Sequence, residues 1–435
     1  MKVKSLYINK YKDLKDFNID FNDDVNIIIG ENGVGKTTIL EIIYNLIISN
    51  TSFTSEDSEF NQCRLGIQLH TDELNYVNST NANLKEPTFN EIDEIIINSV
   101  GENKKLNIDK TEQFYSKSTI FRKKVFRKVI YLPTDVNFKK YKVETPKKIE
   151  NHNEIGVILD SNEMSVSLKE YLVNNHYKDL EDISIGEKPY RIEKFKDLYN
   201  SFFDEKEFLG VKNFEPTFKI KASGEVHSAD ELSAGEKQIF FRGGSLLQLN
   251  LENSIILIDE PELSLHPEWQ QKILKFYRNI GKNNQIIIAT HSPHIVSDCK
   301  REEVRVLFKE NGRVAVKEDV EETYGWTVEQ LLLSVFELKS VRNPEIQNKL
   351  DEFKQLFVNK DKLNNDELDL MNVLRNELEK YLNPEDPSLS LVNLEENSNK
   401  LESLLNKLKN TRVSKEVGIS NSSDNTKGLV RNNNA

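Results

Sequence analysis

Three glycines, a lysine and a threonine stand close together near the N-terminus, at a spacing that suits phosphate binding. Gly30, Gly33 and Gly35 follow an apolar run, and Lys36 and Thr37 come directly after them. Glycines let the backbone curl so that several N–H groups point at one phosphate, and a helix beginning near Lys36 adds its positive end. Lysine supplies a full charge, and the threonine hydroxyl can bind Mg²⁺. The sequence therefore predicts a nucleoside triphosphate site formed by Asn32, Gly33, Gly35, Lys36, Thr37 and Thr38.

A parallel sheet flanked by helices would have to hold this loop. Residues 25–29 have the pattern of a buried strand that enters the loop, and residues 39–48 have the periodicity of a helix that leaves it. Continuous apolar runs at 254–260 and 285–289 are typical of buried parallel strands, and helical periodicity at 269–280 lies between them. This alternation of strands and helices predicts an α/β fold.

Composition and charge limit the class of protein. The net charge of −12 argues against a protein that coats nucleic acid indiscriminately, although the basic stretch 122–148 could still contact DNA. No apolar run approaches the length of about 18 residues that a membrane span needs, and the N-terminus lacks the apolar core of a signal peptide. Cys63 and Cys299 lie far apart and outside any metal-ligand spacing. We therefore expect a reduced, cytoplasmic protein with no membrane partner.

The pattern divides the chain into a core, an insertion, a helical region and a tail. Residues 1–49 and 204–322 carry the α/β pattern and are predicted to form the core. Residues 50–203 mix strand and helix patterns, which indicates an inserted α/β lobe. Residues 323–412 have helical periodicity, and the tail at 413–435 is rich in Asn and Ser, so we expect it to be disordered.

A second motif narrows the class of nucleotide-binding protein. Leu232-Ser233-Ala234-Gly235-Glu236-Lys237-Gln238 resembles the signature motif of ABC-type ATPases, in the form found in SMC- and RecF-like soluble members. The resemblance implies an ABC-type nucleotide-binding domain in which two copies face head to tail and sandwich ATP. Hydroxyl and N–H groups at a helix start can bind an anion. Ser233, Gly235 and Glu236 are therefore expected to contact the nucleotide held by the other copy.

The same resemblance assigns the metal and catalytic roles. The run Ile255–Glu260 resembles the Walker B strand, so Asp259 would hold Mg²⁺ through water and Glu260 would polarise the attacking water as general base. His291, directly after the next predicted strand, resembles the switch histidine of the family, which bonds the γ-phosphate and senses its loss.

Two positions depart from the common ABC pattern. His266 stands where many ABC proteins have the D-loop aspartate, which leaves the D-loop roles of Ser264 and His266 open. This form is similar to the AAA-15/21-type branch of soluble ABC ATPases. A Q-loop glutamine is not evident, and Tyr131–Asp135, which lies about where that loop should be, receives no assignment.

Residues beyond these motifs resemble a narrower family. Thr323–Leu332, with Arg342–Ile346 downstream, resembles the PtuA-type ATPases of bacterial anti-phage systems called Septu, which are also found beside some retrons. That resemblance implies an ATPase that regulates a separately encoded HNH nuclease. The helical pattern after Val341 does not suit a TOPRIM nuclease, and we find no HNH-like cluster, so we expect no nuclease domain in this chain. The alternative is a RecF-like DNA-repair ATPase that acts directly on DNA. A transporter ATPase is disfavoured by the RecF-like opening Asn9–Lys12.

Overall fold

A computed structural model of the chain describes residues 1–48, 61–71, 73–75, 78, 94–99, 106–108, 128–135, 137, 138, 140, 142, 143 and 156–392. The chain divides into two compact units, Met1–Glu337 and Leu338–Ala435. Hydrophobic core clusters lie within each unit. Among the described residues, no helix combines the length and the apolar character needed to cross a membrane.

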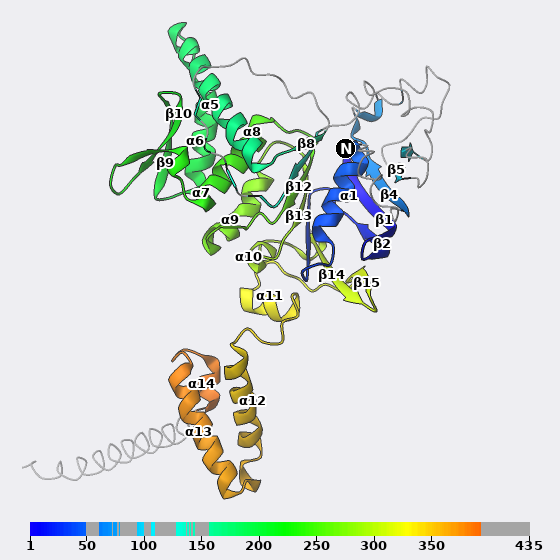
Figure 1. The fold of residues 1–435 in the computed structure, drawn as a ribbon, viewed down its shortest axis with the longest axis vertical. Helices are drawn as coiled ribbons and strands as arrows, with labels where there is room; N and C mark the ends of the chain where they lie inside the picture. Colours follow the sequence, from blue (N-terminus) through cyan, green and yellow to red (C-terminus); the bar gives the residue numbers. More distant parts are fainter. Residues whose placement is uncertain are drawn as a thin grey trace, which may run out of the picture. The chain divides into compact units, whose positions relative to one another are not determined.

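A seven-stranded sheet forms the centre of the larger unit (Figure 1). Its order is β15-β14-β3-β13-β12-β7-β8. The strands are β3 (Val25–Gly30), β7 (Val129–Leu132), β8 (Gly156–Ile158), β12 (Ile255–Asp259), β13 (Gln285–Ala289), β14 (Val304–Glu310) and β15 (Arg313–Val316). Neighbouring strands run parallel except in the β14–β15 hairpin. The predicted α/β class is therefore confirmed.

Side chains of the central strands alternate between two hydrophobic cores. In β12, Ile256 and Ile258 belong to one core, whereas Ile255 and Leu257 belong to the other. Successive side chains of a strand point to opposite faces, and here both faces are covered. The continuous apolar pattern of these strands follows from that double burial.

An antiparallel sheet and helix α1 (Lys36–Ile48) cover one face of the central sheet. The antiparallel order is β2-β1-β4-β5-β6, formed by β1 (Lys2–Tyr11), β2 (Leu14–Asp20), β4 (Asn61–Gln68), β5 (Glu94–Ser99) and β6 (Leu106–Ile108). The Gln285 side chain of β13 joins the two sheets. Its Oε1 accepts from the Val3 N–H at 2.6 Å, and its Nε2 donates to the Val3 carbonyl at 2.8 Å.

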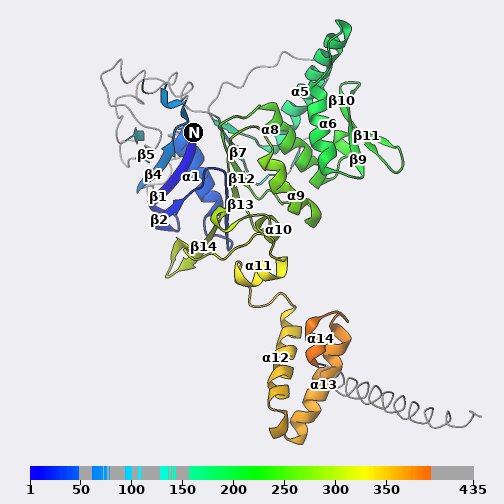
Figure 2. The ribbon, with the colours of Figure 1, turned by 180° about the vertical axis from the view of Figure 1, so that it is seen from behind.

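Helices and a small antiparallel sheet pack against the other face (Figure 2). The helices are α5 (Ser161–Ser184), α6 (Arg191–Phe202), α7 (Ala234–Gln238), the π-helical η2 (Ile239–Gly243), α8 (Gly244–Gln248), α9 (Pro267–Arg278), α10 (Pro293–Val296) and α11 (Val328–Ser334), with short turns η1 (Ala229–Glu231) and η3 (Arg301–Glu303). The small sheet contains β9 (Lys206–Lys212), β10 (Glu215–Ile220) and β11 (Val226–Ser228). Lys169 of α5 is fully buried and pairs with Glu215 at 2.9 Å and Asp230 at 2.8 Å. These ion pairs tie α5 to β10 and to the turn before α7.

The smaller unit is built from helices around its own core. Its elements are α12 (Pro344–Val358), η4 (Lys360–Lys362), α13 (Asn365–Tyr381) and α14 (Pro387–Val392). Asn343 caps α12 by accepting from the Glu345 N–H, and Pro344 takes the first helical position, where its missing N–H costs nothing. Leu350 of α12 and Leu378 of α13 are buried together in this core.

Strands in the first 160 residues belong to the two large sheets. β4 pairs with β1, and β7 pairs with β12. These pairings join strands of the predicted inserted lobe, residues 50–203, to strands of the predicted core. A strand of four residues such as β7 shows its own hydrophobicity in the sequence but not which distant strand it joins. Of the helical region predicted at 323–412, α11 belongs to the larger unit, which extends to Glu337.

Some sequence-based predictions fall outside the described residues. The tail at 413–435 is one of them. Most of the basic stretch 122–148 is another, although Lys128, Lys140 and Lys142 of that stretch are described. The predicted disorder and the predicted DNA contact therefore remain predictions.

Candidate nucleotide site

The phosphate loop connects β3 to α1, as predicted. Gly30 has a φ of +152°, and a Cβ added there would lie 2.4 Å from the Leu307 carbonyl oxygen, so only glycine fits between β3 and β14. The Lys36 ammonium donates to the carbonyl oxygens of Gly30 at 2.9 Å and Glu31 at 3.1 Å. Burial lowers the pKa of Lys36. The Lys36 ammonium is thus hydrogen-bonded to the phosphate loop, where it is expected to bind phosphate.

A cavity of about 350 Å³ opens at this loop. It is lined by Lys12, Asp13, Leu14, Asn32, Gly33, Gly35, Lys36, Thr37, Thr38, Glu260 and His291. The structure therefore brings the six predicted loop residues together with the predicted base and the predicted switch histidine. Sequence reasoning missed the first three residues, which form the turn between β1 and β2 and the first position of β2. The turn itself is visible in the sequence, but nothing local shows that it folds over the phosphate loop.

Asp259 lies at the end of β12, where two hydroxyl groups meet its carboxylate. Thr37 Oγ1 donates to Asp259 Oδ2 at 2.8 Å, and Thr134 Oγ1 donates to the same oxygen at 2.7 Å. Asp259 Oδ1 is buried and has no hydrogen-bond partner among the described residues. A buried carboxylate oxygen beside a threonine hydroxyl at a phosphate loop is the donor set that Mg²⁺ prefers, so these residues fit the predicted metal.

Thr134 is a site residue that sequence reasoning missed. It follows β7 in the segment Tyr131–Asp135, for which the sequence offered no assignment. Because β7 runs parallel to β12, the residue after β7 comes beside the carboxylate after β12. A threonine two residues after a short apolar run is the only local signal.

Glu260 and His291 face each other at the cavity, with His291 Nε2 3.5 Å from Glu260 Oε1. Burial, together with the neighbouring Glu262, raises the pKa of Glu260 to about 8. Burial and then the Lys36 charge lower the pKa of His291. Both shifts disfavour the charged form of the side chain, so the contact between Glu260 and His291 is polar rather than a full ion pair.

Arg242 connects the predicted signature segment to the predicted metal site, a further link that sequence reasoning missed. The side chain is fully buried in η2. It donates to the carbonyl oxygens of Pro133 at 2.6 Å, Asp135 at 3.3 Å and Asp259 at 3.5 Å. An arginine inside the apolar run 239–244 is the signal that could have shown a buried polar contact.

The predicted signature residues lie apart from the cavity. In Figure 1, α7 and α1 lie on opposite sides of β12 and β13, and Ser233, Gly235 and Glu236 do not line the cavity. Ser233 is exposed and caps α7, whereas Gly235 and Glu236 are buried. The Glu236 carboxylate accepts from the Ser233 N–H at 2.8 Å and pairs with Lys206 at 2.7 Å. Within one chain the carboxylate stabilises the turn that presents Ser233, and the expected contact of Glu236 with the nucleotide of another copy stays a prediction.

The D-loop residues also have local structural roles. A Cβ added at Gly235 would lie 2.7 Å from the Ser264 carbonyl oxygen, so the signature turn and the D-loop pack closely within one chain. His266 caps α9, and its Nδ1 accepts from the Glu268 N–H at 3.4 Å. Neither Ser264 nor His266 lines the nucleotide cavity.

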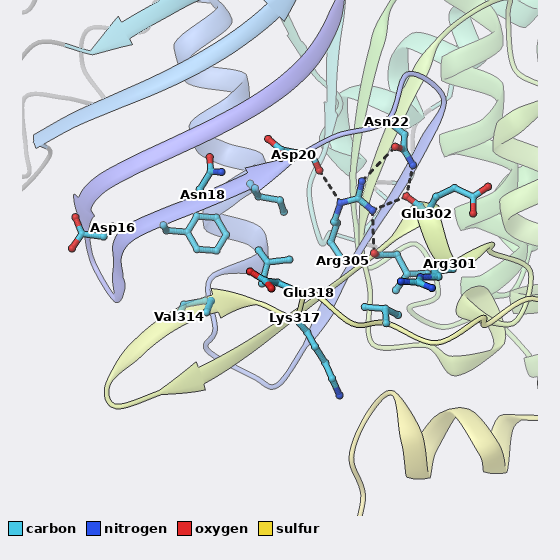
Figure 3. A pocket seen from close by; sticks show the side chains of 16 residues that line it. Asp16, Asn18, Asp20, Asn22, Arg301, Glu302, Arg305, Val314, Lys317 and Glu318 are labelled. Carbon is cyan, nitrogen blue, oxygen red and sulfur yellow. Dashed lines mark hydrogen bonds between the residues drawn. The ribbon is translucent and has the colours of Figure 1, made fainter.

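A larger cleft of about 850 Å³ lies between β2 and β15 (Figure 3). Arg305 spans it, donating to the carbonyl oxygens of Asp20 at 2.7 Å and Glu302 at 2.6 Å. Its lining mixes acidic and basic side chains and contains none of the predicted site residues. The smaller cavity at the phosphate loop is therefore the candidate nucleotide site.

The profile of the AAA_21 family, described as "AAA domain, putative AbiEii toxin, Type IV TA system", matches residues 25–297. The chain belongs to this family. The matched range contains the phosphate loop, the signature segment, the Walker B strand and His291, which confirms the resemblance to AAA-15/21-type soluble ABC ATPases.

Individual relatives of this AAA_21 chain differ in how much of it they match. The Septu protein PtuA of Bacillus thuringiensis is 24% identical over 382 residues, 81% of this chain and 88% of the relative. The "Retron Vc95 probable ATPase" of Vibrio cholerae serotype O1 biovar El Tor is 36% identical over 99 residues, 20% of this chain and 19% of the relative. RecF of Staphylococcus haemolyticus is 42% identical over 59 residues, 14% of this chain and 16% of the relative. Among solved structures, an SMC head domain from Thermotoga maritima has a TM-score of 0.41 and 14% identity, covering 74% of this chain and 100% of that chain.

Proposed function

We propose that this chain is the ATPase subunit of an anti-phage defence complex, and that ATP closes a dimer of it to control a separate partner nuclease. The observation that carries the ATPase part is the convergence of the phosphate loop, the predicted base and the histidine on one cavity, where the lining residue Thr37 also donates a hydrogen bond to Asp259. The defence context is supported by the PtuA relative, which matches most of both chains.

Each residue at the cavity has a chemical task in this proposal. Phosphate oxygens would take the place of the two carbonyl groups that Lys36 now contacts. Thr37 and Asp259 would hold Mg²⁺, which neutralises charge on the phosphate oxygens when bound. In its ionised form Glu260 would orient the attacking water and accept its proton, and uncharged His291 would donate a hydrogen bond to the γ-phosphate.

The second half of each site would come from another copy of the chain. Ser233 is exposed at the start of a helix, and Glu236 faces inward and accepts from the Ser233 N–H, so the exposed end presents the Ser233 hydroxyl. This hydroxyl suits an anion supplied from outside the chain.

One variant tests hydrolysis and dimerisation together. Glu260→Gln should lower the turnover of ATP about 100-fold or more, because the general base is lost, and should accumulate an ATP-bound dimer. Adding Ser233→Glu should prevent that dimer, because a carboxylate would face the γ-phosphate. Light scattering with and without ATP measures the mass, and Glu252→Gln, an exposed glutamate before β12, is the control. Undiminished hydrolysis by Glu260→Gln would refute the catalytic assignment.

The partner is tested by expressing the tagged chain with its native neighbouring genes. A stoichiometric small protein with an HNH motif in the purified complex, and ATP-dependent DNA cleavage by that complex, are the expected results. Purification of the chain alone would contradict the proposed partner while leaving the ATPase assignment intact.

A second candidate function is direct action on DNA, as in a RecF-like repair ATPase. The 42% identity to RecF favours it, but only over 59 residues. This function requires tight, ATP-dependent DNA binding by the isolated chain, which a fluorescence anisotropy titration would detect. The defence role instead requires that such binding depend on the partner.

A further inference from the structure

We propose that Glu262 is a positioning residue that fixes the His291 loop and thereby lets the chain distinguish ATP from ADP. The inference rests on the proposed function of the cavity and adds to it a residue that lies outside the cavity lining.

The geometry begins with two adjacent strand ends. β12 and β13 run parallel and in register up to the pair Asp259 and Ala289, so the turns that follow them lie side by side. The Glu260 N–H donates to the Ala289 carbonyl oxygen at 2.9 Å, which carries the pairing one residue further. Glu262, in the turn after β12, therefore lies beside the residues that connect β13 to His291.

One carboxylate oxygen of Glu262 holds two donors of the His291 loop. Its Oε1 accepts from Thr290 Oγ1 at 2.6 Å and from the His291 N–H at 2.8 Å. Both bonds are charge-assisted, and such bonds are roughly twice as strong as neutral ones. Glu262 thus contacts the backbone of His291 rather than its ring.

Further hydrogen bonds hold the residues on either side of His291. Thr290 Oγ1, while donating to Glu262, accepts from the Ser292 N–H at 2.9 Å. Ser292 Oγ in turn donates to Gln270 Oε1 of α9 at 2.7 Å. The N–H groups on both sides of the His291 Cα are therefore fixed, and only the side-chain torsions of His291 remain to place its ring.

The remaining surroundings of Glu262 show that it does more than complete a turn. Its Oε2 is buried and has no donor among the described residues. The Glu260 carboxyl is a close neighbour of the Glu262 carboxyl. A single side chain thus lies against the predicted base and holds the predicted γ-phosphate sensor, so a change at Glu262 should affect the response to the γ-phosphate more than it affects nucleotide binding as a whole.

The test compares the affinity for Mg²⁺-ADP with that for a non-hydrolysable ATP analogue, by calorimetry on the full chain. The variants are Glu262→Ala, Glu262→Gln, His291→Ala and the double variant Glu262→Ala with His291→Ala, and Glu252→Ala is the exposed control. The preference for the ATP analogue should fall about tenfold in Glu262→Ala, the usual effect of losing hydrogen bonds to a charged group, while the ADP affinity stays the same. Glu262→Gln keeps an oxygen for the same donors and should retain the preference.

The double variant separates a positioning role from a direct contact. Because Glu262 acts through His291, the double variant should lose no more preference than His291→Ala alone. Retention of the preference in Glu262→Ala, when His291→Ala has lost it, would overturn the inference and leave the proposed function standing. An equal loss of ADP affinity in Glu262→Ala would overturn it too, because that result indicates a general structural defect. If the wild-type chain shows no preference for the ATP analogue, both the inference and the proposed switch fail.

Discussion

At the scale of single residues, the site is organised around the Asp259 carboxylate. Two threonine hydroxyls saturate its Oδ2, and this orients the carboxylate while Oδ1 stays buried without a partner among the described residues. A buried oxygen of this kind costs folding free energy unless a cation or a donor meets it. Substitutions of the residues that contact Asp259 should therefore affect Mg²⁺-dependent nucleotide binding before they affect other properties.

Removing the Thr134 hydroxyl should weaken Mg²⁺-dependent binding. Thr134→Val takes away the donor at 2.7 Å from Asp259 Oδ2, and outer contacts to metal ligands contribute about tenfold or more to affinity. We expect the Mg²⁺ concentration for half-maximal ATP binding to rise about tenfold, measured with a fluorescent ATP. Thr134→Ser, which keeps the hydroxyl, should match the wild type. An unchanged Mg²⁺ requirement in the valine variant would show that Thr134 does not orient Asp259.

Glu260 should make stability depend on pH. Its folded pKa of about 8 lies above the value of about 4.5 for an ordinary glutamate, so the folded state binds this proton more tightly. The contribution of Glu260 to the stability of the folded state is complete below about pH 4.5 and is lost as the pH rises to about 8. Glu260→Gln cannot ionise and should raise the melting temperature of the nucleotide-free protein by about 3 °C or more at pH 9, with little change at pH 5. A similar gain at both pH values would contradict the raised pKa.

At the scale of elements, the carboxyl ends of neighbouring parallel strands supply the site. β3 leads into the phosphate loop, β12 ends in Asp259, β13 leads to His291, and β7 leads to Thr134. The first three strands could be predicted from sequence, because each is a mostly apolar run followed by residues of recognisable chemistry. β7 and the Glu262 contacts could not, since each depends on which distant strand lies alongside, and a local pattern does not contain that information.

The junction of β3 with the loop should not tolerate a side chain. In Gly30→Ala the new Cβ would meet the Leu307 carbonyl oxygen at 2.4 Å, so β14 must shift and the loop with it. We expect a loss of about 3 kcal/mol or more in the free energy of unfolding, by urea titration, together with loss of ATP binding. Gly224→Ala is the matched control, because Gly224 also has a positive φ, of +75°, but has nothing within 4 Å of an added Cβ. It should lose only about 1 kcal/mol. Equal losses would mean that φ alone, not the contact with β14, explains the effect.

At the scale of the whole molecule, the complete nucleotide cavity belongs to the larger unit. All its lining residues lie within Met1–Glu337, and the smaller unit has a core of its own. ATP binding and the stability of the larger unit should therefore not need the smaller one.

A chain that ends at Glu337 tests this independence. It should remain soluble, unfold cooperatively and bind Mg²⁺-ATP with an affinity within about threefold of that of the full chain, because the truncation removes no residue that lines the cavity. Aggregation of the shortened chain, or loss of ATP binding, would show that the smaller unit supports the site.

The Gln285–Val3 hydrogen bonds have a consequence for how the protein is made. The two residues are 282 positions apart in the sequence, and their hydrogen bonds join the two large sheets of the larger unit. At about 5–20 residues per second, a ribosome needs roughly 15–60 s between synthesising one and the other. During that interval β3 has no β13 or β14 to pair with, so its apolar side chains stay open to solvent or to other chains. Heterologous production of this protein should therefore benefit from slower initiation, lower temperature or extra chaperone capacity, all of which protect the nascent N-terminal half until its last strands arrive.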